Sequence, residues 1–154
     1  MKSQNPGKRE GNGSNRETGL LDLRTAEARQ SVILVADDDV TSRNLVTGLL
    51  QLDGHSVLCA SDGHEGLELS RQYPGSIDLL ITGVQMSQLN GTELCNHLFQ
   101  ERPGIKAMFV ASEKINASVN QDANVPLLTK PIDGPALIAK VRAILTAATR
   151  PPTH

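Results

Sequence analysis

The most constraining feature of this chain is a short apolar run that leads directly into three carboxylates, at residues 31–39. An unbroken apolar run of this length, bounded by polar residues, is typical of a strand buried on both faces. Residues 40–52 then carry apolar side chains at helical spacing, with Thr41 or Ser42 as the expected N-cap and Gly54 just past the end. The acids therefore lie where a buried strand meets a crossover helix, the edge at which α/β sheets bind ligands.

Strand-like and helical segments alternate along the rest of the chain. Strands are expected at residues 32–36, 56–61, 77–82, 106–112 and 125–129. Helices are expected at residues 40–52, 63–71, 91–101, 115–122 and 134–148, the last with Asp133 as its N-cap. This alternation with short connections predicts a three-layer α/β fold with a parallel sheet, whose commonest order for five strands is 2-1-3-4-5.

The length of 154 residues indicates one domain, expected at residues 31–148 between a disordered N-terminal tail, 1–30, and a C-terminal tail, 149–154. The formal net charge of −2 argues against a nucleic-acid-binding surface. The sequence has neither an apolar stretch long enough to span a membrane nor a signal-like N-terminus, which predicts a soluble, cytoplasmic protein without membrane partners.

The cysteines and histidines indicate no metal or catalytic site. Cys59 and Cys95 have no metal-binding spacing and are expected to be reduced, buried thiols. The four histidines share no face or spacing, and all are expected on the surface or in loops: His55, His64, His97 and His154.

Charged residues from strands far apart in the sequence are predicted to meet at one edge. In the expected order the first and third strands are neighbours, ending at Asp37 and Asp38 and at Gly83 respectively. Lys130 ends the fifth strand, and the proline after it keeps it extended. A lone lysine at a strand end is usually a surface charge. Here Lys130 closes the same edge as two aspartates, which favours a shared pocket.

Three segments carry a resemblance to a known family: ILVADDD at 33–39, DLLITGVQMSQLNGTEL at 78–94 and LLTKPID at 127–133. Together they resemble the receiver domains of bacterial two-component response regulators, over residues 32–148. The resemblance implies a flavodoxin-like (βα)5 fold. It also implies that Asp37 and Asp38 help to hold Mg²⁺ and that Lys130 contacts a phosphoryl group.

The chain departs from the family pattern at the positions that carry its chemistry. Gly83 stands where the family has its phosphoacceptor aspartate, and Ser87 replaces a common proline. Ala111 occupies the position of the strand-four hydroxyl, and Leu127 that of the frequent aromatic switch residue. A glycine in a loop is also compatible with a positive φ at position 83.

No nearby residue is a good substitute acceptor. Asp78 is expected roughly 16 Å away at the opposite edge of the sheet, from a rise of about 3.3 Å per residue. Thr82 is expected to point to the other face of the strand. Ser87 and Ser112 lie near the edge, but a serine does not form an acyl phosphate.

The sequence therefore favours a non-enzymatic, phosphorylation-deficient receiver that acts as a protein-interaction module, without an output domain on this chain. Its expected partners are signalling proteins: a histidine kinase, a phosphotransfer protein or an output protein. Mg²⁺ binding is expected to be weak, through Asp38, an outer Asp37 and the backbone carbonyl of Gln85. Two alternatives stay open. One is a conventional receiver whose aspartate was altered at Gly83, and the other is a small-ligand-binding or enzymatic domain of the same fold.

Overall fold

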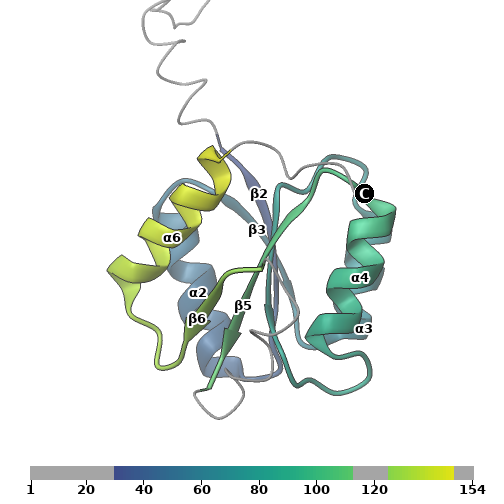
Figure 1. Cartoon of the computed structure of the whole chain (residues 1–154), viewed down its shortest axis with the longest axis horizontal. Helices are drawn as coiled ribbons and strands as arrows, with labels where there is room; N and C mark the ends of the chain where they lie inside the picture. Colours follow the sequence, from purple (N-terminus) through teal and green to yellow (C-terminus); the bar gives the residue numbers. More distant parts are fainter. Residues whose placement is uncertain (1–29, 113–124, 148–154) are drawn as a thin grey trace, which may run out of the picture. The chain divides into compact units, whose positions relative to one another are not determined.

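A computed structural model describes residues 30–112 and 125–147 of the chain. Its strands form one five-stranded sheet in the order β3-β2-β4-β5-β6, with every pairing parallel (Figure 1). The strands are β2 (Val32–Ala36), β3 (Ser56–Ala60), β4 (Leu79–Gly83), β5 (Lys106–Ala111) and β6 (Leu127–Thr129). The helices are α2 (Val40–Leu52), α3 (Gly63–Gln72), α4 (Gly91–Glu101) and α6 (Gly134–Thr146). The predicted 2-1-3-4-5 order is confirmed.

Helices cover both faces of the sheet because alternate strand residues are buried on opposite sides. Helices α2 and α6 lie on one face, and α3 and α4 on the other (Figure 1). The first layer buries Ile33, Val35, Val46, Leu50, Leu79, Ile81, Met108, Val110, Leu137 and Val141. The second buries Leu34, Ala36, Ala60, Leu67, Ile77, Leu80, Leu94, Cys95, Leu98, Ile105, Ala107 and Phe109.

Two strands begin later than expected because a side chain or a proline interrupts the backbone ladder. The Asp78 amide donates to the Val32 carbonyl at 2.8 Å, but the Val32 amide donates to the Asp78 carboxylate, also at 2.8 Å, and not to a backbone carbonyl. β4 therefore starts at residue 79 rather than 77. The Pro126 carbonyl accepts the Phe109 amide, but Pro126 has no N–H to donate, and β6 starts at residue 127 rather than 125.

The N-cap of α2 is Asp39, so the expectation of Thr41 or Ser42 was wrong. Asp39 has extended backbone angles, and its carboxylate accepts hydrogen bonds from the amides of both of those residues. An aspartate outside the first turn can satisfy these free N–H groups, whereas residues within the turn cannot. The Asp133 N-cap of α6 is confirmed.

Some expectations fall outside the described ranges. These are the two tails and the helix at residues 115–122. In the part of the chain that is described, no helix is both long and apolar enough to cross a membrane.

Candidate functional site

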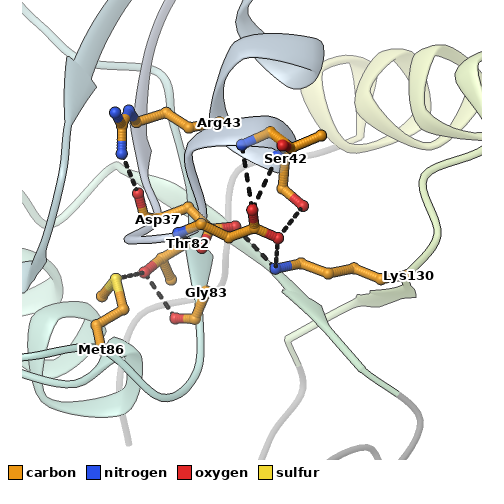
Figure 2. A network of polar contacts seen from close by, with 9 residues as sticks. Asp37, Ser42, Arg43, Thr82, Gly83, Met86 and Lys130 are labelled. Carbon is orange, nitrogen blue, oxygen red and sulfur yellow. Dashed lines mark hydrogen bonds and ion pairs between the residues drawn. The ribbon is translucent and has the colours of Figure 1, made fainter.

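The buried carboxylate at the end of β2 forms the centre of the site. Asp37 is only 5% exposed. One carboxylate oxygen, Oδ1, accepts the Asp39 amide at 3.0 Å, and the other, Oδ2, lies 3.2 Å from the Lys130 ammonium. Its backbone carbonyl accepts a hydrogen bond from the Arg43 guanidinium at 2.8 Å (Figure 2). A buried carboxylate needs such partners, and here the Asp39 amide and the Lys130 ammonium supply them.

The carboxylate of Asp39 joins helix α2 to the same cluster. Its Oδ2 accepts the Ser42 hydroxyl at 2.9 Å and lies 3.4 Å from the Lys130 ammonium. The hydrogen bond from the Ser42 side chain is the main cause that lowers the pKa of Asp39 below its usual value, and Lys130 adds to the effect. Asp39 thus stabilises the start of α2 and holds the lysine at once.

Lys130 approaches the two carboxylates from the end of β6, whereas the aspartates follow the end of β2. Its amide donates to the Ala111 carbonyl at 2.8 Å, which fixes its backbone beside the end of β5. Its peptide bond to Pro131 is cis. The side chain is 23% exposed, and its ammonium contacts both Asp39 and Asp37, the latter labelled beside it in Figure 2. One ammonium therefore connects the β6–α6 loop to the junction of β2 and α2.

Asp38 does not take the place expected for it. Lys130 was expected to gather Asp37 and Asp38, but within the described residues its ion pairs are with Asp37 and Asp39, and Asp38 is exposed. The chain bends at residue 38 between β2 and α2, and the carboxylate of the residue after this bend, Asp39, lies beside Lys130. The run of three acids contained this signal, because the third stands directly before the helix.

Gly83 is the last residue of β4 and is buried beside Asp37. A Cβ atom built on it would lie 3.1 Å from Asp37 Oδ1 and 3.3 Å from its Cγ. Its φ is not positive, so the loop-glycine explanation was wrong: the backbone angles at this position do not require glycine. A side chain here would point at the Asp37 carboxylate, and glycine leaves that position without a reactive group.

The loop after β4 is held close to the edge by a second glycine. The Gly91 amide donates to the Val84 carbonyl at 2.7 Å, and a Cβ on Gly91 would collide with the Gly83 carbonyl oxygen. Asn90 and Glu93 form a reciprocal capping box at the start of α4. Gln85 and Ser87 are exposed in this loop.

The residues at the neighbouring positions are mostly apolar or engaged elsewhere. Ala111 is buried at the end of β5, and Leu127 is half-buried against the layer that contains α3 and α4. Thr82 is fully buried, and its hydroxyl donates to the Gly83 carbonyl at 2.8 Å. Ser112 is exposed just past β5. Asp78 pairs with the start of β2, at the other end of β4.

The donor set at this edge does not fit a tightly held magnesium ion. Mg²⁺ prefers octahedral oxygen ligation and gives up its waters reluctantly. Here the carboxylates of Asp37 and Asp39 face an ammonium, and Gly83 adds no oxygen from a side chain. Among the residues described, no group of three or more His, Cys, Asp or Glu side chains could hold a metal ion.

The expectation of two buried thiols was wrong for one of the cysteines. Cys59 is exposed, because β3 lies at the edge of the sheet; Cys95 is buried as expected. His55 lies in a loop, as expected, and is partly buried: both ring nitrogens are covered and lack a hydrogen-bond partner, with Asp53 3.5 Å from one of them. The side chain of His64 is exposed, and His97 is half-exposed. His154 lies outside the described residues.

Comparison with known proteins gives one consistent family. The family model described as the response regulator receiver domain matches residues 33–142. The chain is 34% identical to the transcriptional regulatory protein CpxR of Escherichia coli K12 over 118 residues, which cover 73% of this chain and 48% of CpxR. It is 30% identical to the sensor kinase CckA of Brucella abortus over 118 residues, 75% of this chain and 12% of CckA. The chain therefore spans at most about half of these relatives.

Solved structures agree with this comparison. A response regulator receiver domain protein from Clostridium thermocellum superposes with a TM-score of 0.67 at 27% identity. The match covers 75% of this chain and 94% of that one. The structural similarity therefore extends over three quarters of this chain.

Proposed function

Because this chain belongs to the response regulator receiver domain family, we propose that it acts in two-component signal transduction as a protein-interaction module that works without phosphorylation. The observation that carries this proposal is Gly83. It ends β4 beside Asp37, at the position that corresponds to the family's phosphoacceptor, and it has no side chain to accept a phosphoryl group.

The relay positions support the same conclusion. In the family a hydroxyl on the fourth strand follows the phosphoryl group, and an aromatic residue on the fifth strand follows the hydroxyl. Here those positions are Ala111 and Leu127, which can neither form that hydrogen bond nor rotate an aromatic ring. A ligand shifts a conformational equilibrium only through contacts that differ between the states. The binding surface is therefore proposed to be presented constantly.

Partners of this module are proposed to be signalling proteins: a histidine kinase, a phosphotransfer protein or an output protein. The similarity to the sensor kinase CckA and to the transcriptional regulatory protein CpxR supports this choice of partners. Weak Mg²⁺ binding is also part of the proposal, because Asp37 already has a cationic partner in Lys130.

The proposal is tested by measuring affinity for a partner kinase or phosphotransfer protein from the same organism, with and without acetyl phosphate. The wild-type affinity should stay within about threefold, which is under 1 kcal/mol. A change of about tenfold or more on treatment of the wild type would overturn the proposal. A Gly83→Asp variant serves as the comparison, and restoring the acceptor alone should leave its affinity within the same limit.

An altered conventional receiver is the second candidate, and one observation favours it. The backbone at Gly83 does not require glycine, and Asp37 and Lys130 still form an ion pair beside it. That candidate predicts a phosphorylation-dependent change in partner affinity for Gly83→Asp. The proposed module predicts none, because Ala111 and Leu127 remain unable to respond.

A further inference from the structure

Lys130 occupies the position where a cation is needed to balance the acidic edge. Its ammonium lies 3.2 Å from Asp37 Oδ2 and 3.4 Å from Asp39 Oδ2 (Figure 2). Consecutive carboxylates at the end of a buried strand repel one another, and an opposite charge within about 4–6 Å relieves that repulsion. Among the side chains described at this edge, the lysine makes the ion pairs of both acids.

The third aspartate explains why the lysine is held here. Asp39 is fixed by its capping role, since its carboxylate accepts from two amides and from the Ser42 hydroxyl. Asp37 is fixed by burial and by the Asp39 amide. Two immobilised carboxylate oxygens thus face Lys130, while Gly83 adds no third carboxylate that could recruit a metal ion.

We infer that Lys130 is the resident cation of this edge: its ammonium takes the place of a divalent ion and fastens the β6–α6 loop to the start of α2. The inference rests on the proposed function only in the weak Mg²⁺ binding that it explains, and it does not depend on phosphorylation. Lys130 thus has a positioning role, because its ammonium contacts both Asp37 and Asp39.

Removal of the ammonium should therefore create a dependence on divalent cations that the native protein lacks. In Lys130→Met, Asp37 and Asp39 keep their hydrogen bonds within the β2–α2 junction but lose their cationic partner. Their carboxylates, together with Asp38, then become available to Mg²⁺. A ligand that binds the folded state stabilises it in proportion to the logarithm of its concentration.

The experiment uses circular dichroism to measure melting temperatures in about 10 mM MgCl₂ and in NaCl of equal ionic strength. This Mg²⁺ concentration suits a weak carboxylate site. In Mg²⁺ the melting temperature of the wild type should shift by less than about 1 °C, and that of Lys130→Met should rise by about 3 °C or more. Lys140→Met is the matched control, because Lys140 lies on α6 and has no ion pair in the described structure. It should behave like wild type.

Lys130→Arg keeps the positive charge, so its melting temperature should be as insensitive to Mg²⁺ as that of the wild type. As a second readout, Mn²⁺ should broaden the amide signals of residues 37–39 in Lys130→Met but not in wild type. Two results would overturn the inference. One is an equal rise in the melting temperatures of the wild type and Lys130→Met in Mg²⁺. The other is a Lys130→Met variant whose melting temperature does not respond to Mg²⁺ and whose amide signals do not respond to Mn²⁺. Neither measurement involves phosphorylation, so a failure here is distinguishable from a failure of the proposed function.

Discussion

Gly83 differs from the other glycines at this edge because nothing in its backbone requires glycine. Gly91 and Gly63 both lie where two backbone segments approach closely. A Cβ on Gly91 would collide with the Gly83 carbonyl, and a Cβ on Gly63 would collide with the Leu89 carbonyl. Gly83 has an ordinary φ, and a Cβ there would meet only the Asp37 carboxylate at close range. Substitution of this residue therefore tests electrostatics rather than backbone strain.

Gly83→Asp should lower the stability of the metal-free protein more than Gly83→Asn, which adds the same volume without a charge. Like charges about 4 Å apart repel by about 4 kcal/mol at an effective dielectric constant near 20. Lys130 and partial protonation reduce this, so we expect a difference of about 1–2 kcal/mol at neutral pH. Urea unfolding of the two variants, with and without Mg²⁺, measures it, and Mg²⁺ should recover part of the loss.

The free energies of unfolding of Gly83→Asp and Gly83→Asn should become equal at acidic pH. Repulsion by Asp37 raises the folded-state pKa of the inserted aspartate, so the penalty exists only above its unfolded pKa of about 3.9 and disappears below it. Equal stability of the Asp and Asn variants at neutral pH, whether Mg²⁺ is present or absent, would show that position 83 and Asp37 do not interact.

At the scale of helices and strands, sequence periodicity located every described element, whereas local chemistry set its ends. Apolar spacing placed α2 at residues 40–52, but it could not choose its N-cap, because aspartate, serine and threonine all cap helices well. The starts of β4 and β6 depended on a side-chain contact of Asp78 and on the missing N–H of Pro126. Neither effect appears in a hydrophobic pattern.

Two alanine substitutions should have opposite effects on stability. Gly91→Ala forces a methyl group against the Gly83 carbonyl and should cost about 2 kcal/mol or more. Gly48→Ala, in the interior of α2, meets nothing within 4 Å and should add about 0.5–1 kcal/mol. Urea unfolding measures both. A neutral Gly91→Ala would contradict the close contact between the loop and the end of β4.

At the scale of the whole molecule, the strand order could be predicted because strands and helices alternate, and this order brings the ends of β2, β4 and β6 to one edge. The meeting of Asp37, Gly83 and Lys130 follows from that topology. The topology does not predict that Asp39, and not Asp38, is the second partner of Lys130. That contact depends on where each side chain points after the strand ends. The exposure of Cys59 and the burial of His55 likewise depend on tertiary packing.

The two thiols should differ sharply in reactivity in the folded molecule. Cys59 is exposed on the edge strand β3, whereas burial raises the pKa of Cys95 to about 12. A chromogenic disulfide reagent should therefore titrate one thiol rapidly in the native protein and the second only after denaturant is added. Equal rates for both thiols under native conditions would contradict the packing of α4 on the sheet.

The most direct test of the central claim is the intact mass of the protein after incubation with acetyl phosphate and Mg²⁺. We predict no phosphoryl adduct on the wild type, because Gly83 offers no carboxylate and Thr82 is fully buried. Any adduct on Gly83→Asp should be lost in hydroxylamine, as expected of an acyl phosphate. A hydroxylamine-sensitive adduct on the wild-type protein, mapped to any residue at this edge, would contradict the account.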